Sequence, residues 1–128
     1  MVGKNIYGGT YSLFNEYFAE RGLEFDSVDT ADYEALDAAI SGRDRGGRAA
    51  SAVYFETLTN PLLQINNVNR ISAIAHRYGA LSIVDNTFVT PYLQQPLDLG
   101  ADIVIHSGHQ IPGRPFRGER RPCGGVGR

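Results

Sequence analysis

Cysteine, lysine and long hydrophobic runs are scarce or absent in this chain of 128 residues. The single cysteine, Cys123, excludes an internal disulfide framework and a zinc site built from several cysteines, and we predict no metal site. No apolar run approaches the roughly 18 residues that a membrane-spanning helix needs, and the N-terminal residues lack the apolar core of a secretory signal. We therefore expect a cytoplasmic protein with no membrane partner.

Charge is distributed unevenly along the chain. Lys4 is the only lysine, against eleven arginines. Residues 1–110 contain seven basic and thirteen acidic side chains, whereas residues 111–128 contain five arginines and one glutamate, together with five glycines and three prolines. Because no helical or strand periodicity continues beyond Ser107, we expect a globular domain over residues 1–107 and a disordered basic tail over residues 108–128.

Helical and strand patterns alternate along the globular part, as in a parallel sheet that helices cover on both faces. Apolar or alternating runs predict five strands, at residues 5–7, 23–28, 51–56, 80–84 and 101–106. Apolar side chains at helical spacing predict three helices, at residues 13–18, 33–40 and 68–78. We expect Asp32 and either Asn66 or Asn67 as N-caps, and Gly22 and Gly79 as helix ends. The predicted fold class is α/β with a mostly parallel sheet.

Polar side chains follow several of the predicted strands. They form clusters at residues 56–60, 85–87 and 106–107, and Tyr7 ends the first predicted strand. The carboxyl ends of parallel strands share one edge of the sheet, and ligands bind beyond that edge in open α/β sheets. We therefore expect these side chains to gather at one rim.

Each side chain at this rim has a structural and a functional interpretation. Asp85 could cap a loop or oppose a bound cation, because an unpaired carboxylate at the end of an apolar strand is costly. Asn60 could cap a turn or bond a ligand oxygen, and Ser107 could end a strand or hold a phosphate. Tyr7 could be a core residue or a surface on which a ring stacks. His106 fits a half-buried imidazole with a satisfied hydrogen bond.

The order of these motifs resembles the Cys/Met-metabolism family of pyridoxal 5′-phosphate (PLP) enzymes. The matching segments are YGGTY (7–11), ETLTNP (56–61), VDNTF (84–88), TPYLQ (90–94) and GADIVIHS (100–107). The family includes cystathionine γ-synthase, cystathionine β- and γ-lyases, methionine γ-lyase and O-acetylhomoserine sulfhydrylase. The resemblance implies a partial PLP-binding large domain with the three-layer α/β/α architecture of fold-type I enzymes.

The resemblance implies that five side chains bind the cofactor: Tyr7, Asn60, Asp85, Thr87 and Ser107. Tyr7 would stack on the pyridine ring, and Asp85 would pair with the protonated ring nitrogen and keep the ring an electron acceptor. Asn60 would hydrogen-bond the phenolic oxygen of the ring, and Ser107 would contact the phosphate. Glu56 would be a supporting carboxylate behind these groups.

The chain departs from the family pattern directly after Ser107. The family continues Ala-Thr-Lys-Tyr-Leu-Gly-Gly-His-Ser, and its lysine attaches PLP covalently, but Gln110 stands at the lysine position. An amide nitrogen is not a nucleophilic amine. We therefore expect no catalytic residue in this chain, no catalysis, and at most weak non-covalent binding of PLP.

A one-base shift of the reading frame accounts for this departure. When the segment from Gly108 to Arg117 is back-translated and read one base later, its codons admit the nine family residues in order. We infer a frameshift at codon 107 or 108, which makes residues 108–128 an out-of-frame tail. We also expect a central fragment, because the family's N-terminal strand–helix unit and C-terminal domain have no counterpart here.

Two functions compete at this point. The first is a fragment of a PLP enzyme of transsulfuration, a family that eliminates or replaces β- or γ-substituents on cysteine, methionine, cystathionine or O-acylhomoserine. The alternative is a non-catalytic α/β binding module whose basic tail binds nucleic acid or another anion. Phe116 is the only aromatic residue among the five arginines, which gives nucleic-acid binding little support. The resemblance implies an amino-acid substrate and a homotetramer for the parent family.

Overall fold

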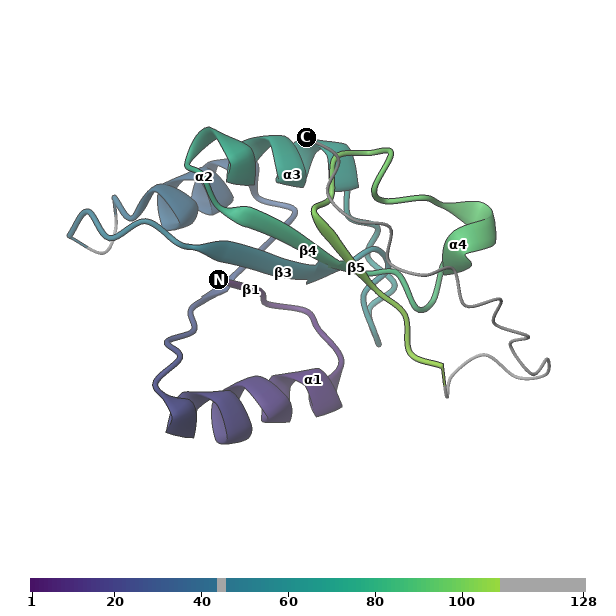
Figure 1. The fold of residues 1–128 in the computed structure, drawn as a ribbon, viewed down its shortest axis with the longest axis horizontal. Helices are drawn as coiled ribbons and strands as arrows, with labels where there is room; N and C mark the ends of the chain where they lie inside the picture. The colour runs from purple at the N-terminus through teal and green to yellow at the C-terminus, as the bar shows by residue number, and fades with distance from the viewer. Residues whose placement is uncertain (44–45, 109–128) are drawn as a thin grey trace, which may run out of the picture.

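A five-stranded sheet with helices on both faces forms the centre of the computed structural model, which describes residues 1–43 and 46–108 (Figure 1). The strand order is β2-β1-β3-β4-β5, and every neighbouring pair is parallel. The strands are β1 (Val2–Gly3), β2 (Ser27–Val28), β3 (Ala52–Glu56), β4 (Leu81–Asp85) and β5 (Ile103–Ile105). The predicted α/β class and parallel sheet are confirmed. The predictions for Gln110 and for the tail beyond Gly108 lie outside the described residues.

Two helices, α2 (Tyr33–Ser41) and α3 (Val68–Arg77), cover one face of the sheet (Figure 1). Helix α1 (Gly8–Ser12) lies on the opposite face, and the short α4 (Thr90–Leu93) lies near β5 (Figure 1). This arrangement is the three-layer α/β/α architecture. Asp32 caps α2 through its side chain, as predicted, and Asn67 rather than Asn66 caps α3.

The main hydrophobic core lies between the sheet and the helices α2 and α3. Its fully buried members alternate along β3 and recur at helical spacing on α2 and α3, as side chains facing one core must. They include Leu36, Ile40, Val53, Phe55, Val68, Ile71, Ala75 and Val84. The sheet and the helices α2 and α3 therefore enclose one continuous hydrophobic core.

The opposite face is covered more thinly. Helix α1 continues through a π-helical segment, Leu13–Phe18, and a 3₁₀ turn, Ala19–Arg21, and no residue of the whole segment 8–21 is buried. Phe14 makes its main packing contacts, with ring centroids 4.7 Å from Phe25 and 5.2 Å from Tyr54. The segment ends at Gly22 in the left-handed region, as predicted, with a φ of 81°.

Two N-terminal strands differ from those that the sequence predicts. The strand predicted at residues 5–7 is wrong: β1 covers Val2–Gly3, and the chain leaves the sheet after the amide of Lys4 bonds the Val28 carbonyl. β2 covers only Ser27–Val28 of the predicted 23–28 strand, and the exposed Leu23 lies outside the ladder. The sequence pattern therefore locates these two strands only approximately and does not fix which residues pair.

No helix in the described part of the chain has the length and apolar character that crossing a membrane requires. Within the same residues, no three or more histidine, cysteine, aspartate or glutamate side chains gather closely enough to hold a metal ion.

Candidate functional site

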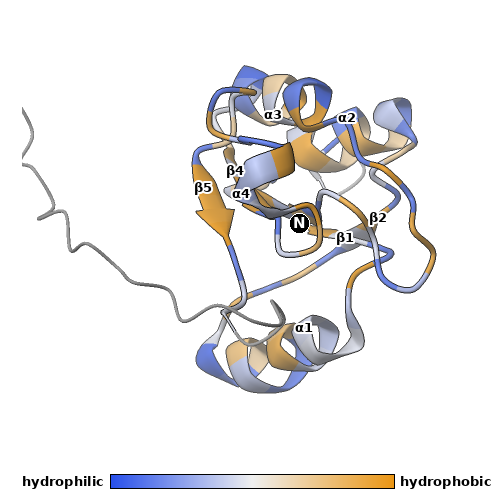
Figure 2. Cartoon of the chain, turned by 90° about the vertical axis from the view of Figure 1, so that its right-hand side faces the viewer, coloured by the Kyte–Doolittle hydropathy of each residue, from blue (hydrophilic) through white to orange (hydrophobic). Residues whose placement is uncertain are grey.

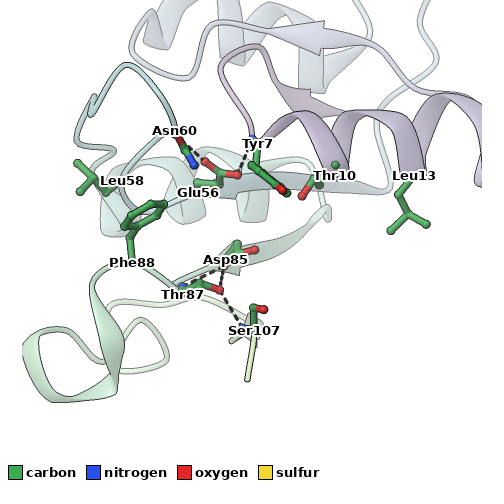
Figure 3. Close-up of a pocket in the computed structure, with 11 residues that line it drawn as sticks. Tyr7, Thr10, Leu13, Glu56, Leu58, Asn60, Asp85, Thr87, Phe88 and Ser107 are labelled. Atoms are coloured by element: carbon green, nitrogen blue, oxygen red, sulfur yellow. Dashed lines mark hydrogen bonds between the residues drawn. The ribbon is translucent and has the colours of Figure 1, made fainter. Parts of the chain in front are cut away.

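A pocket of about 240 Å³ opens at the carboxyl ends of β3 and β4, on the side of the sheet that carries α1 (Figure 3). Its lining includes all the side chains for which the sequence predicts cofactor contact or support: Tyr7, Glu56, Asn60, Asp85, Thr87 and Ser107. Residues from three separate strand ends and from the start of α1 thus meet at one rim. The remaining lining residues are Gly9, Thr10, Leu13, Leu58 and Phe88.

Asp85 is the last residue of β4, and both oxygens of its carboxylate are engaged. Oδ1 accepts hydrogen bonds from the backbone N–H of Thr87, at 2.9 Å, and from its hydroxyl, at 2.5 Å. Oδ2 accepts a hydrogen bond from the hydroxyl of Tyr54, at 3.1 Å. The carboxylate therefore caps the turn that follows β4 and also lines the pocket with a fixed orientation. The structural and functional interpretations of Asp85 are compatible.

Glu56 lies directly opposite Asp85 in the parallel register. Its carboxylate accepts the backbone N–H of Tyr7 at 2.7 Å and the backbone N–H of Asn60 at 3.1 Å (Figure 3). Burial raises the pKa of Glu56, the two N–H donors lower it, and the negative charge of Asp85 raises it, for a net rise. Glu56 thus ties together the two loops that carry Tyr7 and Asn60.

Tyr7 precedes α1 and reaches the pocket with a side chain that is 47% exposed. Its ring lies so close to Gly9 that a Cβ atom at that position would come within 2.6 Å of the ring carbon Cε1. Glycine at position 9 therefore leaves space for the ring. This close approach supports the interpretation of Tyr7 as an exposed aromatic surface rather than a core residue.

Thr87 links the ends of β4 and β5. Its hydroxyl oxygen donates to Asp85 and accepts a hydrogen bond from the backbone N–H of Ser107, at 2.9 Å. Ser107 therefore enters the pocket lining through a direct connection to the turn after β4. The neighbouring His106 is exposed, so the expectation of a half-buried imidazole is wrong; this residue lies beyond the end of β5 at Ile105.

Asn86 lies beneath the rim; the sequence places it in the polar cluster 85–87, but sequence reasoning gave it no role. Its fully buried side chain donates to the carbonyls of Thr90, at 3.1 Å, and Gln94, at 3.0 Å, and accepts from the hydroxyl of Thr57, at 2.9 Å. These bonds hold the loop that carries Thr87 and Phe88. Asn86 lies between Asp85 and Thr87, two residues with an expected role at the site, and this position was the signal in the sequence that it supports them.

Tyr54 is the second residue that sequence reasoning missed. It was assigned only to a buried strand, although it precedes Glu56 by two positions and therefore shares its face of β3. That face carries the pocket. Alternation along the strand was thus a signal that the Tyr54 hydroxyl could reach the rim.

The donor set of the pocket fits a phosphorylated pyridine such as PLP. The carboxylate of Asp85 can accept a hydrogen bond from a protonated ring nitrogen, and an aromatic side chain, Tyr7, can cover a ring face. The Asn60 amide and the Ser107 hydroxyl can bond oxygen atoms of a ligand. Open α/β domains bind their ligands at this carboxyl edge of a parallel sheet.

The chain belongs to the Cys/Met metabolism PLP-dependent enzyme family, whose model matches residues 1–111. A cystathionine beta-lyase of Lactococcus lactis subsp. cremoris is 44% identical over 113 residues, which are 88% of this chain and 28% of the relative. The chain therefore spans less than a third of the length of this curated relative.

Two crystal structures of such enzymes have a fold similar to that of this chain. Cystathionine gamma-lyase from Lactobacillus plantarum, complexed with L-serine, superposes with a TM-score of 0.75 at 46% identity, over 83% of this chain and 26% of that chain. A Campylobacter jejuni protein described as an O-acetylhomoserine (thiol)-lyase has a TM-score of 0.72 at 34% identity, over 83% and 24% of the two chains. That structure contains a pyridoxyl-lysine phosphate. The predicted family and the α/β fold of fold-type I enzymes are confirmed, and the family's cofactor is PLP.

Proposed function

We propose that this chain carries the ring-binding part of the cofactor site of a PLP-dependent enzyme of sulfur amino-acid metabolism. The observation that supports this proposal most strongly is the convergence of Tyr7, Asn60, Asp85 and Ser107 on one pocket. When bound, PLP supplies an electron-accepting ring that stabilises negative charge on an amino-acid substrate. The chain's own residues orient that ring and hold the proton on its nitrogen.

Each side chain has a defined task in this proposal. Asp85 holds a proton on the ring nitrogen, because its fixed carboxylate provides a charged hydrogen-bond acceptor. Tyr7 covers one face of the ring, Asn60 bonds the phenolic oxygen, and Ser107 contacts the phosphate. Glu56 keeps Tyr7 and Asn60 in register through their backbone amides.

This chain performs the binding step and not the chemistry. Gln110 stands at the position of the family's cofactor-binding lysine, and a glutamine amide cannot attach PLP covalently. Lys4 precedes Tyr7 in the sequence, is exposed next to β1, and does not line the pocket. We propose that residues 108–128 are translated out of frame and that the parent protein is an ordinary family enzyme with its lysine intact.

Titration with pyridoxine 5′-phosphate tests the binding role. This compound keeps the ring nitrogen, phenolic oxygen and phosphate but lacks the aldehyde, so it cannot react with Lys4 or the N-terminal amine. We expect saturable, weak binding followed by NMR, with chemical-shift changes at Tyr7, Asn60 and Ser107. Asp85→Ala should weaken binding at least tenfold, because one charge-assisted hydrogen bond is lost.

The matched control is Asp98→Ala, which removes an exposed carboxylate outside the pocket lining and should leave binding unchanged. Binding that is equal in the wild type and Asp85→Ala would contradict the proposal. The reading-frame proposal is tested separately by sequencing the gene across codons 100–128. One base fewer, with an open frame through Ala-Thr-Lys-Tyr-Leu-Gly-Gly, is the expected result, and an unchanged base count would contradict it.

The particular reaction also belongs to the parent protein. The relatives described above are a beta-lyase, a gamma-lyase and a protein described as a thiol-lyase. We propose an amino-acid substrate carrying a leaving group at its β- or γ-carbon. An assay of the frame-corrected gene product, in its full natural length, with cystathionine and O-acetylhomoserine should show turnover of at least one of them. Turnover of neither would contradict this assignment.

A further inference from the structure

Tyr54 lies in the centre of β3, and its ring is on the face of the sheet that carries α1. Its side chain is 7% exposed and packs with Val2 and Ile6 in the smaller of the two hydrophobic clusters. The ring of Phe14 meets it edge-on, at a centroid distance of 5.2 Å. The aromatic ring is therefore held by its neighbours, and the hydroxyl reaches Asp85, which lines the pocket.

The hydroxyl of Tyr54 meets the carboxylate that the proposed function assigns to the ring nitrogen. It donates to Oδ2 of Asp85 at 3.1 Å, while Thr87 occupies Oδ1 with two donors. A carboxylate held at both oxygens cannot rotate about its χ2 angle without losing hydrogen bonds. Because Tyr54 approaches from the buried strand rather than from the turn, it fixes Asp85 in a direction that Thr87 alone does not define.

The phenol of Tyr54 also stays protonated at neutral pH, because its pKa lies above the ordinary tyrosine value. Burial raises the pKa of Tyr54, and the negative charge of Asp85 raises it further. The Tyr54 hydroxyl is therefore available as a hydrogen-bond donor to Oδ2 of Asp85.

We propose that Tyr54 is a positioning residue of the cofactor site: its hydroxyl, bonded to Oδ2 of Asp85, orients that carboxylate toward the nitrogen of a bound pyridine ring. The inference rests on the proposed function, because it assumes that Asp85 faces the ring nitrogen. Tyr54 itself does not contact the ring.

Two ligands and two matched variants test this role. The ligands are pyridoxine 5′-phosphate and its analogue with a carbon–hydrogen unit in place of the ring nitrogen. Tyr54→Phe removes the hydroxyl that bonds Asp85, and Tyr17→Phe removes the hydroxyl of a half-exposed tyrosine on the π-helical segment. Wild type and Tyr17→Phe should prefer the nitrogen-containing ligand by about tenfold. Tyr54→Phe should reduce this preference to about threefold or less.

A merely structural role would weaken binding of both ligands equally, and that result, or an unchanged preference, would overturn the proposal. A ligand-free measurement separates the inference from the proposed function. The carboxyl ¹³C resonance of Asp85 should shift in Tyr54→Phe and stay in place in Tyr17→Phe, because only the first variant removes a donor to that group. An unmoved resonance would overturn the proposal even if both ligands bind. If the resonance shifts but the wild type binds both ligands equally or neither, the proposed role of Asp85 fails instead.

Discussion

The two faces of the sheet differ in how completely the chain covers them. On the α2–α3 face, thirteen buried residues form one cluster, and both helices carry side-chain N-caps. On the α1 face, three buried residues form a small cluster, and the helical segment 8–21 buries none of its residues and has no side-chain cap. The stability of the domain therefore arises mainly on the first face, and the candidate site lies on the second.

Strand β5 shows the same contrast. Ile103 and Ile105 pair with Ile83 and Asp85 in the parallel register, so they share the α1 face, and they are 43% and 40% exposed. The hydropathy colouring shows β5 as an apolar strand at the edge of the sheet (Figure 2). The face that carries the pocket thus includes apolar surface that is only partly covered, whereas the other face of the sheet packs against α2 and α3.

The largest predicted effect tests where the stability lies. Leu36→Ala, in the fully buried core under α2, should lower the free energy of unfolding by about 3 kcal/mol, because it leaves a cavity. Leu13→Ala, the same change at a side chain that is 45% exposed on the α1 face, should alter it by about 0.5 kcal/mol or less. Urea unfolding followed by circular dichroism measures both. Equal losses would refute the asymmetry between the faces.

A smaller loss in the free energy of unfolding is expected at Asn86, which holds the loop after β4. Asn86→Ala should cost about 2 kcal/mol, because the Thr57 hydroxyl and the carbonyls of Thr90 and Gln94 lose their partner in a buried place. Hydrogen exchange should also accelerate in residues 87–94 while α3 stays protected. A matched control is Asn69→Ala, which removes an exposed side chain with a single bond of 3.3 Å to a carbonyl. Uniform acceleration throughout the chain would show that Asn86 has no local role.

Glu56, which lines the pocket, should make the folded protein less stable as the pH rises. Its pKa is raised in the folded protein, chiefly by burial. Its stabilising contribution is therefore complete below its unfolded pKa of about 4.5 and is lost as the pH rises through the folded value. In urea titrations at several pH values, Glu56→Gln should remove this loss of stability. A profile identical to the wild type would contradict the assigned pKa shift.

Asp102, on the α3 side, should give the opposite and smallest dependence. Its pKa is lowered by a hydrogen bond from the Ser82 amide, at 2.7 Å, and next by His76, whose Nε2 lies 2.9 Å away. Its contribution is present above its unfolded pKa of 3.8 and is lost as the pH falls through the folded value. Asp102→Asn should flatten the acid limb of the stability profile. An equally steep acid limb would show that the hydrogen bonds to the Asp102 carboxylate carry no pH-dependent stability.

Much of this molecule could be predicted from local sequence. Strands β3 and β4 follow from their apolar residues, and the Asp32 cap and the helix end at Gly22 follow from side-chain chemistry and backbone freedom. The sequence narrowed the cap of α3 to Asn66 or Asn67, and the structure selects Asn67. The meeting of polar residues at one rim followed from the parallel topology. The lengths of β1 and β2 could not be predicted, because pairing depends on where neighbouring strands end.

The roles of Tyr54 and Asn86 also lay beyond local sequence. Tyr54 reads as a core aromatic, and only the register of β3 against β4 shows that its hydroxyl reaches Asp85. Asn86 reads as a turn residue, and only the path of the loop from 87 to 94 shows that it holds two carbonyls. Both roles depend on contacts between segments far apart in sequence or on the shape of a loop.

Hydrogen exchange with and without pyridoxine 5′-phosphate tests the division of roles between the two faces most directly. The account predicts slower exchange on ligand addition in residues 7–13, 57–60 and 85–88, which surround the pocket, and no change in α2 and α3. Protection confined to α2 and α3, or no protection at saturating ligand, would contradict the assignment of the α1 face as the cofactor site.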